Sequence, residues 1–164
     1  MPSTPIPVQR LRDPVILVAA GLGSGCAPRA PGTAGTLVGV LVYLPLAPLP
    51  LGPYGLLTLA LFLLGVPLCT AAARRLGVHD HPGIVWDEVV GYLVTMTAAP
   101  AGWPWVAAGF LLFRLFDIAK PWPIRSIDRR VAGGLGIMLD DVLAGLFAAA
   151  ALQALAWLVA GGGG

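Results

Sequence analysis

Apolar residues dominate this chain in long stretches that no charged residue interrupts. Asp, Glu, Lys and Arg are absent from residues 30–73, 89–113 and 142–164, which are stretches of 44, 25 and 23 residues. About 20 apolar residues in a helix cross the roughly 30 Å of hydrocarbon in a bilayer. The pattern therefore predicts a polytopic integral membrane protein made of helices.

The longest stretch is too long for one helix and has prolines and glycines in its middle, over residues 45–55. Breakers of this kind end helices and form turns. We therefore expect the chain to fold back on itself there, with one span over about 36–49 and another over about 54–73. The two spans would form a helical hairpin.

The middle stretch is interrupted at residues 99–104 by the sequence Ala-Pro-Ala-Gly-Trp-Pro. Its flanks, over 85–98 and 105–118, predict two short helices in a hairpin or one long kinked span. The last stretch predicts a final span over about 142–159. The expected fold is an all-α, polytopic integral membrane bundle with four to five short spans.

Composition agrees with this interpretation. Of the 164 residues, 57% are apolar and 11% are charged, against about 45–50% and about 25% in soluble domains. The net charge of +2 is thinly spread, so nucleic acid is not an expected partner. We expect one membrane-embedded domain over residues 1–160, with no processed export signal, and a flexible glycine tail over 161–164. Cys26 and Cys69 are too few for a disulfide framework and are interpreted as packing residues.

The charged residues form three clusters that the predicted hairpins place on one side of the membrane. The opposite turns, near Gly52 and Gly102, carry no charge. Because Lys and Arg in short loops are retained in the cytoplasm, the charged side should be cytoplasmic. The clusters are Arg10, Arg12, Asp13 and Arg29; Arg74, Arg75, Asp80, Asp87 and Glu88; and the charged residues from 114 to 141.

Five carboxylates lie within about a turn of a predicted span. A single acid there can be a helix-end residue that reaches water, but ionisable groups at such depth are costly and usually functional. Adjacent carboxylates also repel each other unless a cation lies near them. Because the chain has only two histidines, its oxygen ligands favour Mg²⁺ over zinc. The five are Asp87, Glu88, Asp117, Asp140 and Asp141.

Basic residues accompany these acids. Arg114 precedes Asp117 by three residues, near one face of a helix that Pro121 would terminate. Lys120 and Arg125 follow at the helix end, where they could hold an anion. The same residues also fit the ordinary excess of cations in cytoplasmic loops.

Two glycine-rich segments could approach a ligand closely. The first, over residues 21–35, includes Gly32 and Thr33 just before the first predicted span. Backbone N–H groups at such a helix start can bind phosphate, and the hydroxyls of Thr33 and Thr36 could donate to it. The second, over 133–141, ends in the pair Asp140-Asp141 and lets a ligand reach the carboxylates.

Acids for a cation and donors for an anion, together at the inner membrane surface, indicate a phosphorylated lipid headgroup. No Asp-x-Asp nucleophile pair is present, and the Cys69-x5-Arg75 spacing has a helix-forming filler rather than a phosphate loop. The segment 79–81, His-Asp-His, lacks the further histidines of a zinc site. The competing class is a small cation-binding membrane transporter, whose acids would lie near mid-membrane rather than at one end of the spans.

Four sequence blocks resemble the phosphatidylglycerophosphatase A family, in the family's order and with similar spacing. The resemblance implies a Mg²⁺-dependent, multi-pass enzyme of the bacterial inner membrane with its active site facing the cytoplasm. Its substrate would be a phospholipid in the bilayer, phosphatidylglycerophosphate, whose terminal phosphomonoester is hydrolysed to give phosphatidylglycerol. The blocks are A-P-G-T-A-G at 30–35, I-V-W-D-E-V-V-G at 84–91, F-R-L-F-D-I-A-K-P-W-P-I at 113–124 and G-G-L-G-I-M-L-D-D-V-L-A-G at 133–145.

The resemblance also implies a division of roles among the candidate residues. Asp117 would be a further metal ligand or would orient the attacking water. Attack by water is preferred over a phospho-enzyme, and another lipid phosphate such as phosphatidate is an alternative substrate. One or two metals, and any oligomeric state, fit the sequence. Mg²⁺ would be held by Asp87, Glu88, Asp140 and Asp141, and phosphate by Lys120, Arg125, Arg114, Gly32 and Thr33.

Overall fold

The computed structural model describes residues 5–78 and 81–161, apart from the side chains at 128 and 129, and every regular element in that part of the chain is helical. The all-α expectation is confirmed. Residues 79–80 of the His-Asp-His segment and 162–164 of the glycine tail lie outside the described residues. The elements are η1 (Val8–Arg12), α1 (Pro14–Ala19), η2 (Gly21–Cys26), α2 (Pro31–Leu46), α3 (Leu51–Leu76), α4 (Trp86–Thr95), α5 (Trp103–Ala119), α6 (Ile124–Arg130) and α7 (Gly133–Gly161).

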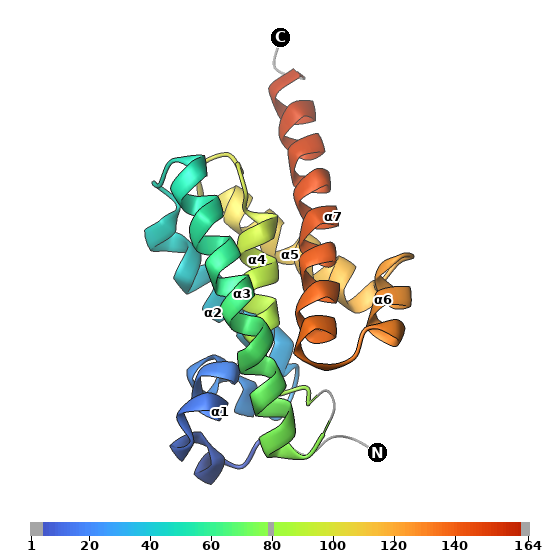
Figure 1. Cartoon of the computed structure of the whole chain (residues 1–164). Helices are drawn as coiled ribbons and strands as arrows, with labels where there is room; N and C mark the ends of the chain where they lie inside the picture. The colour runs from blue at the N-terminus through green and yellow to red at the C-terminus, as the bar shows by residue number, and fades with distance from the viewer. Residues whose placement is uncertain (1–4, 79–80, 162–164) are drawn as a thin grey trace.

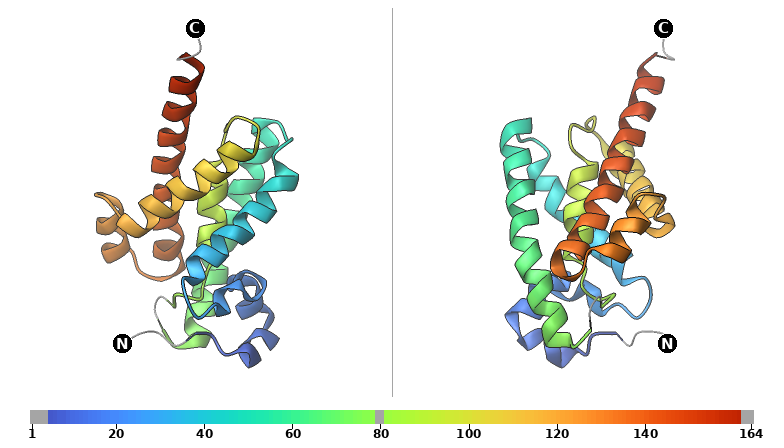
Figure 2. Two further views of the ribbon diagram at one scale, coloured as in Figure 1. Left: turned by 180° about the vertical axis from the view of Figure 1, so that it is seen from behind. Right: turned by 45° about the vertical axis from the view of Figure 1, so that its right-hand side comes forward.

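Helix α4 lies at the centre of the bundle, in contact with α2, α3, α5 and α7. Helices α2 and α3 form a hairpin on one side, α5 crosses behind, and α7 runs along α4 and extends past the rest of the bundle (Figures 1 and 2). The short N-terminal helices pack near the C-terminal end of α3. Both α4 and α7 begin at the end of the bundle opposite the α2–α3 turn (Figure 1).

The breakers predicted at 45–55 and 99–104 do separate consecutive helices, α2 from α3 and α4 from α5, and local chemistry explains the helix ends. Pro31 lies at the start of α2, where its missing N–H costs nothing. Gly102, with φ of 119°, precedes α5, and Gly77, with φ of 72°, caps α3. The span predicted over about 36–49 corresponds to α2, which begins earlier, at Pro31, and ends at Leu46, one residue after Pro45.

The largest departure from the sequence prediction is the start of α7. This helix begins at Gly133 rather than near residue 142, so Asp140 and Asp141 lie inside it. Its glycines are packing positions rather than a loop: a Cβ on Gly134 would lie 2.7 Å from the Thr70 backbone nitrogen on α3. Glycine at this position therefore lets α7 approach α3 at backbone distance.

Two glycines bring α4 and α7 together in the same way. A Cβ on Gly145 would lie 2.5 Å from the Gly91 carbonyl oxygen, and a Cβ on Gly91 would lie 2.8 Å from the Asp141 carbonyl oxygen. Small residues of this kind are typical of closely packed membrane helices. The crossing places the first turn of α4 next to Asp141.

Two described helices, α3 and α7, are long and apolar enough to cross a membrane. Only 28% and 22% of their most apolar segments are buried within the protein, whereas the core helix of a soluble protein is mostly buried. Large apolar side chains such as Leu64 and Trp157 are 64% and 75% exposed. Helices α2, α4 and α5 are shorter, with 16, 10 and 17 residues, so the expectation of four to five spans is met only in part.

Candidate active site

A cavity of about 270 Å³ brings together the residues that sequence reasoning selected. It receives side chains from the starts of α2 and α4, the end of α5 and the second turn of α7. All five predicted acids line it, together with two of the predicted cations. The lining residues are Ala30, Pro31, Gly32, Pro82, Ile84, Asp87, Glu88, Arg114, Asp117, Lys120, Asp140 and Asp141.

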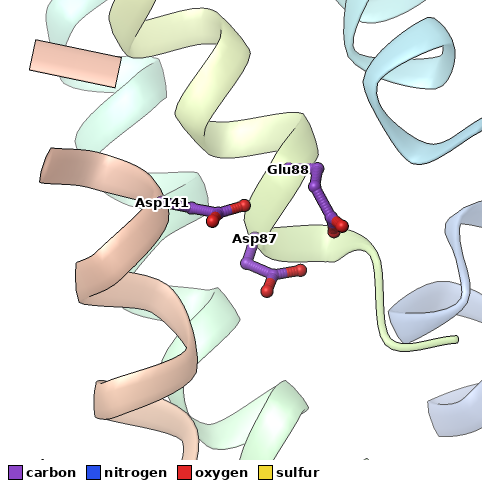
Figure 3. A group of neighbouring side chains, drawn as sticks. All are labelled: Asp87, Glu88 and Asp141. Carbon is purple, nitrogen blue, oxygen red and sulfur yellow. The ribbon is translucent and has the colours of Figure 1, made fainter. Parts of the chain in front are cut away.

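Three carboxylates converge at the centre of this cavity. One oxygen each from Asp87, Glu88 and Asp141 can be chosen so that all three lie within 4.8 Å of one another. Figure 3 shows Asp141 reaching from α7 toward Asp87 and Glu88 on the first turn of α4. Within the described part of the chain, Oε2 of Glu88 and Oδ2 of Asp141 are buried with no hydrogen-bond partner. A hard divalent cation among these oxygens would supply the missing partner.

Asp140 is oriented differently from its neighbour. Its Oδ2 accepts a hydrogen bond from Lys120 Nζ at 2.5 Å, in an ion pair that links α7 to the end of α5. Consecutive residues on a helix point about 100° apart, since a turn takes 3.6 residues. The structure therefore brings three of the four predicted metal ligands into the cluster and places Asp140 beside it, on the lysine.

Arg114 lies between two of the acids. Its guanidinium pairs with Asp117 one turn away, as the sequence predicted, and Nη1 is also 3.9 Å from Glu88 Oε1. The Nε atom of Arg114 is buried without a hydrogen-bond partner among the described residues. The side chain of Asp117 also lies within hydrogen-bonding reach of Asp141. Asp117 therefore connects the arginine to the three-carboxylate cluster.

The cavity has a marked excess of negative charge. Five carboxylates and two cationic side chains line it, so full ionisation leaves three unbalanced negative charges. Like charges in a shared low-dielectric site are unfavourable unless protons or cations compensate them. Bound protons or cations must therefore compensate part of the negative charge of this cavity.

The start of α2 closes one side of the cavity. Ala30 has left-handed backbone geometry, with φ of 49°, and turns the chain into Pro31 and the helix. A Cβ on Gly32 would overlap Glu88 Oε1 and lie 3.0 Å from Arg114 Nη1, so only glycine fits there without displacing them. Sequence reasoning identified Gly32 but not Ala30, whose strained backbone has no signal in the sequence.

The predicted threonine donors are placed less favourably. The hydroxyl of Thr36 donates to the Gly32 carbonyl oxygen at 2.8 Å within α2. The hydroxyl proton of Thr36 is therefore used within the helix in this structure, and its role as a phosphate donor stays a prediction. Thr33 is half-buried and is not among the residues that line the cavity.

Arg125 lies outside this cavity but next to it. It lines a second cavity of about 290 Å³, together with Lys120, Trp122 and Ser126. Lys120 is a wall residue of both cavities. The predicted phosphate ligands thus divide between two adjoining spaces, with Arg114 in the first, Arg125 in the second and Lys120 between them.

Comparison with known proteins identifies the family. The family model for phosphatidylglycerophosphatase A matches residues 17–156, a range that includes every residue of the acidic cavity. The chain belongs to the phosphatidylglycerophosphatase A family. This confirms the resemblance seen in the four sequence blocks.

Members of the phosphatidylglycerophosphatase A family from two bacteria are similar along most of the chain. The Escherichia coli (strain K12) enzyme of that name is 46% identical over 144 residues, covering 87% of this chain and 84% of the relative. The Haemophilus influenzae enzyme is 44% identical over 151 residues, covering 89% and 91%. A Bacteroides thetaiotaomicron relative with the provisional name phosphatidylinositol-3-phosphatase is 37% identical over 151 residues, covering 88% and 94%. No solved structure matches significantly.

Proposed function

We propose that this protein is a Mg²⁺-dependent lipid phosphatase that hydrolyses the terminal phosphomonoester of phosphatidylglycerophosphate to give phosphatidylglycerol. Membership of the phosphatidylglycerophosphatase A family supports the reaction and the substrate. The observation that carries the proposal is the buried cluster of Asp87, Glu88 and Asp141 beside the guanidinium of Arg114. It combines ligands for a hard cation with a donor for phosphate oxygens.

The oxygen cluster is the proposed magnesium site. Asp87, Glu88 and Asp141 would hold the ion, and Asp117, beside Asp141, is available as a further ligand. When bound, Mg²⁺ would polarise the phosphoryl oxygens and compensate part of the negative charge of the site. The buried oxygens of Glu88 and Asp141 that lack a hydrogen-bond partner favour this assignment.

The substrate phosphate is proposed to enter between the cluster and the cations. Arg114 is fixed by Asp117 and Glu88, so its guanidinium is already oriented toward the site before substrate binds. Lys120, held by Asp140, contributes a second positive charge to the lining of the same cavity. Preoriented charges of this kind stabilise the negative charge that is redistributed during phosphoryl transfer. We propose that Asp117 orients the attacking water.

The site is proposed to lie at the cytoplasmic surface of a bacterial inner membrane. The apolar, outward-facing surfaces of α3 and α7 support membrane embedding. The acids lie near helix ends, on the first turn of α4, in the last turn of α5 and in the first third of α7, which favours headgroup chemistry over a cation pathway. A multi-pass topology would place α2 and α5 in the membrane as well.

A second candidate substrate is another lipid that carries a phosphomonoester. The Bacteroides thetaiotaomicron relative is named for activity on phosphatidylinositol 3-phosphate rather than on phosphatidylglycerophosphate. The acidic cavity would bind the phosphomonoester of any such headgroup. Parallel assays with phosphatidylinositol 3-phosphate and phosphatidate therefore belong beside the main assay.

The proposal is tested by phosphate release from phosphatidylglycerophosphate by the detergent-purified protein, with Mg²⁺ and after chelation. We expect wild-type activity that requires Mg²⁺ and falls at least about 100-fold in Asp87→Asn and Asp141→Asn, since metal binding supplies several kcal/mol to the transition state. Asp13→Asn is the control, because Asp13 caps α1 and pairs with Arg75, away from the cavity.

A second measurement separates metal binding from folding. Mg²⁺ should raise the unfolding temperature of the wild type, because a ligand that binds the folded state stabilises it, and should not raise that of Asp141→Asn. Equal activity in all variants would disprove the site. Absence of phosphate release by the folded wild type would disprove the function.

A further inference from the structure

The second cavity, beside the acidic one, has the character of an anion site. It holds about 290 Å³ and is lined by Lys120, Trp122, Arg125 and Ser126, together with small residues. Within the part of the chain that the structure describes, it has cationic and hydroxyl side chains but no carboxylate in its lining. This composition is opposite to that of the acidic cavity, although the two share Lys120.

Arg125 lies on the wall of this cavity and is exposed, so its guanidinium is accessible to an anion that enters the cavity. Arginine is suited to phosphate because its planar fork donates two parallel hydrogen bonds. The hydroxyl of Ser126, half-buried on the same wall, can donate a further one.

The backbone at Lys120 also fits a binding role. Lys120 ends α5 in left-handed geometry, with φ of 42°. Such geometry is costly for a residue with a Cβ, and it persists where surrounding structure maintains it, often at ligand sites. Here it places the lysine on the boundary between the two cavities.

An apolar stripe on α5 leads to the second cavity from the membrane side. Leu111, Leu115 and Ile118 are 67%, 58% and 71% exposed, and their spacing of four and three residues puts them on one face of the helix. Trp122, which is 80% exposed, lies beyond them on the wall of the cavity. Tryptophan is enriched at the headgroup level of membranes. In a membrane, this stripe would face acyl chains, and Trp122 would place the cavity near the headgroups.

We propose that the second cavity binds the phosphodiester of the lipid substrate, with Arg125 and Ser126 as its donors, while the acidic cavity holds the terminal phosphomonoester. This inference rests on the proposed function. Lys120, on the shared wall, lies where a short glycerol bridge would join the two phosphates. The arrangement selects lipids that carry a phosphodiester and a phosphomonoester; phosphatidate, with its single phosphate, can fill only one of the two cavities.

The two cavities can be examined separately with two inhibitors of phosphatidylglycerophosphate hydrolysis. The product phosphatidylglycerol carries only the phosphodiester, and orthophosphate resembles only the phosphomonoester. We expect Arg125→Gln to raise KM and the inhibition constant of phosphatidylglycerol about tenfold or more, the loss typical of a charged hydrogen-bonded contact. It should leave kcat and inhibition by orthophosphate within about twofold of wild type, because uniform binding affects KM alone.

Arg130→Gln is the matched control. It removes the same charge from the same short helix, at an exposed position outside the lining of the cavity. Arg125→Lys should recover part of the affinity for phosphatidylglycerol, since it restores the charge but not the planar fork. Direct titration of short-chain phosphatidylglycerol into each detergent-purified variant gives the same comparison without turnover.

The outcomes distinguish this inference from the proposed function. Wild-type hydrolysis together with equal phosphatidylglycerol affinity in Arg125→Gln and Arg130→Gln would overturn the phosphodiester site alone. Equal weakening of phosphatidylglycerol and orthophosphate inhibition in Arg125→Gln would also overturn it, because Arg125 would then serve the reacting phosphate. Absence of hydrolysis by folded wild type would overturn the proposed function, and the binding titration would still decide whether Arg125 holds the phosphodiester.

Discussion

Gly32, at the start of α2, has no side chain, and the charged groups of the site lie directly against its Cα. A methyl group there would overlap Glu88 Oε1 and crowd both terminal nitrogens of Arg114. These two side chains lie next to each other, with Arg114 Nη1 3.9 Å from Glu88 Oε1, and they join the proposed metal cluster to the proposed phosphate ligand. Glycine is therefore needed at this position to leave room for the side chains of the site, and not to form the helix.

This gives a prediction that separates activity from stability. Gly32→Ala should lower kcat/KM for phosphatidylglycerophosphate about 100-fold or more, because a small displacement of reacting groups is costly. The unfolding temperature should change little, since alanine favours helix over glycine by about 1 kcal/mol and offsets part of the local crowding. Gly55→Ala on α3 is the control, because a Cβ there meets nothing within 4 Å. Full activity in Gly32→Ala would contradict this arrangement of the cavity.

The chemistry of the site could be predicted from the sequence, but the directions of its side chains could not. Acid types, their bunching near span ends and the spacing of Arg114 and Asp117 identified the lining residues. Asp140 and Asp141 looked equivalent in the sequence. They differ because the rotation of α7 against α4 and α5 turns one toward the cluster and the other toward Lys120. That rotation depends on packing between distant segments.

Among the helices, the crossing of α4 and α7 determines the geometry of the metal cluster. Asp87 and Glu88 come from one helix and Asp141 from the other. Gly91 and Gly145 hold the two backbones in contact one turn away from these acids. A change in the separation of the helices would therefore move the ligands apart.

We expect Gly145→Ala to separate the two helices. Its Cβ would lie 2.5 Å from the Gly91 carbonyl oxygen, a backbone atom that cannot rotate away, and overpacking of this kind costs about 1–3 kcal/mol. The unfolding temperature should fall, and the rise in that temperature on adding Mg²⁺ should shrink. Gly161→Ala, on the same helix with no neighbour within 4 Å, should match the wild type in both measurements. If the two variants behave alike, the close crossing does not control the cluster.

The helices and the turns between them could be predicted from the sequence, because the length of an apolar stretch and the prolines and glycines that interrupt it are local signals. The start of α7 did not, because glycines at 133–136 are typical of a loop when read alone. The backbone of α3 beside them makes glycine the residue that fits inside this helix. A tertiary contact thus overrides the local preference.

In the whole molecule, the charged residues form three clusters along the chain, and the turns between α2 and α3 and before α5 have none. The α2–α3 turn comes just before Gly52, and Gly102 lies directly before α5; no charged residue lies near either in the sequence. Such an arrangement favours insertion with the charged clusters in the cytoplasm, since Lys and Arg resist transfer across the membrane.

Reporter fusions test this orientation. An alkaline phosphatase fusion after Gly52 or Gly102 should be active, because its fusion point would be periplasmic, and a fusion after Arg75 should be inactive. Labelling of single cysteines at the same positions from outside the cell provides an independent control of fusion artefacts. A cytoplasmic signal at Gly52 and Gly102 would reverse the topology.

The exposed stripe of Leu111, Leu115 and Ile118 bears on which substrate concentration would control the reaction rate. Under the proposed function, a lipid that keeps its acyl chains against α5 would be hydrolysed without leaving the bilayer, so enzyme and substrate would meet by lateral diffusion in two dimensions. The rate then depends on the number of substrate molecules per area of membrane. Synthesis of neutral bulk lipid would slow the reaction by dilution within the surface, with no change in the amount of enzyme or substrate in the cell.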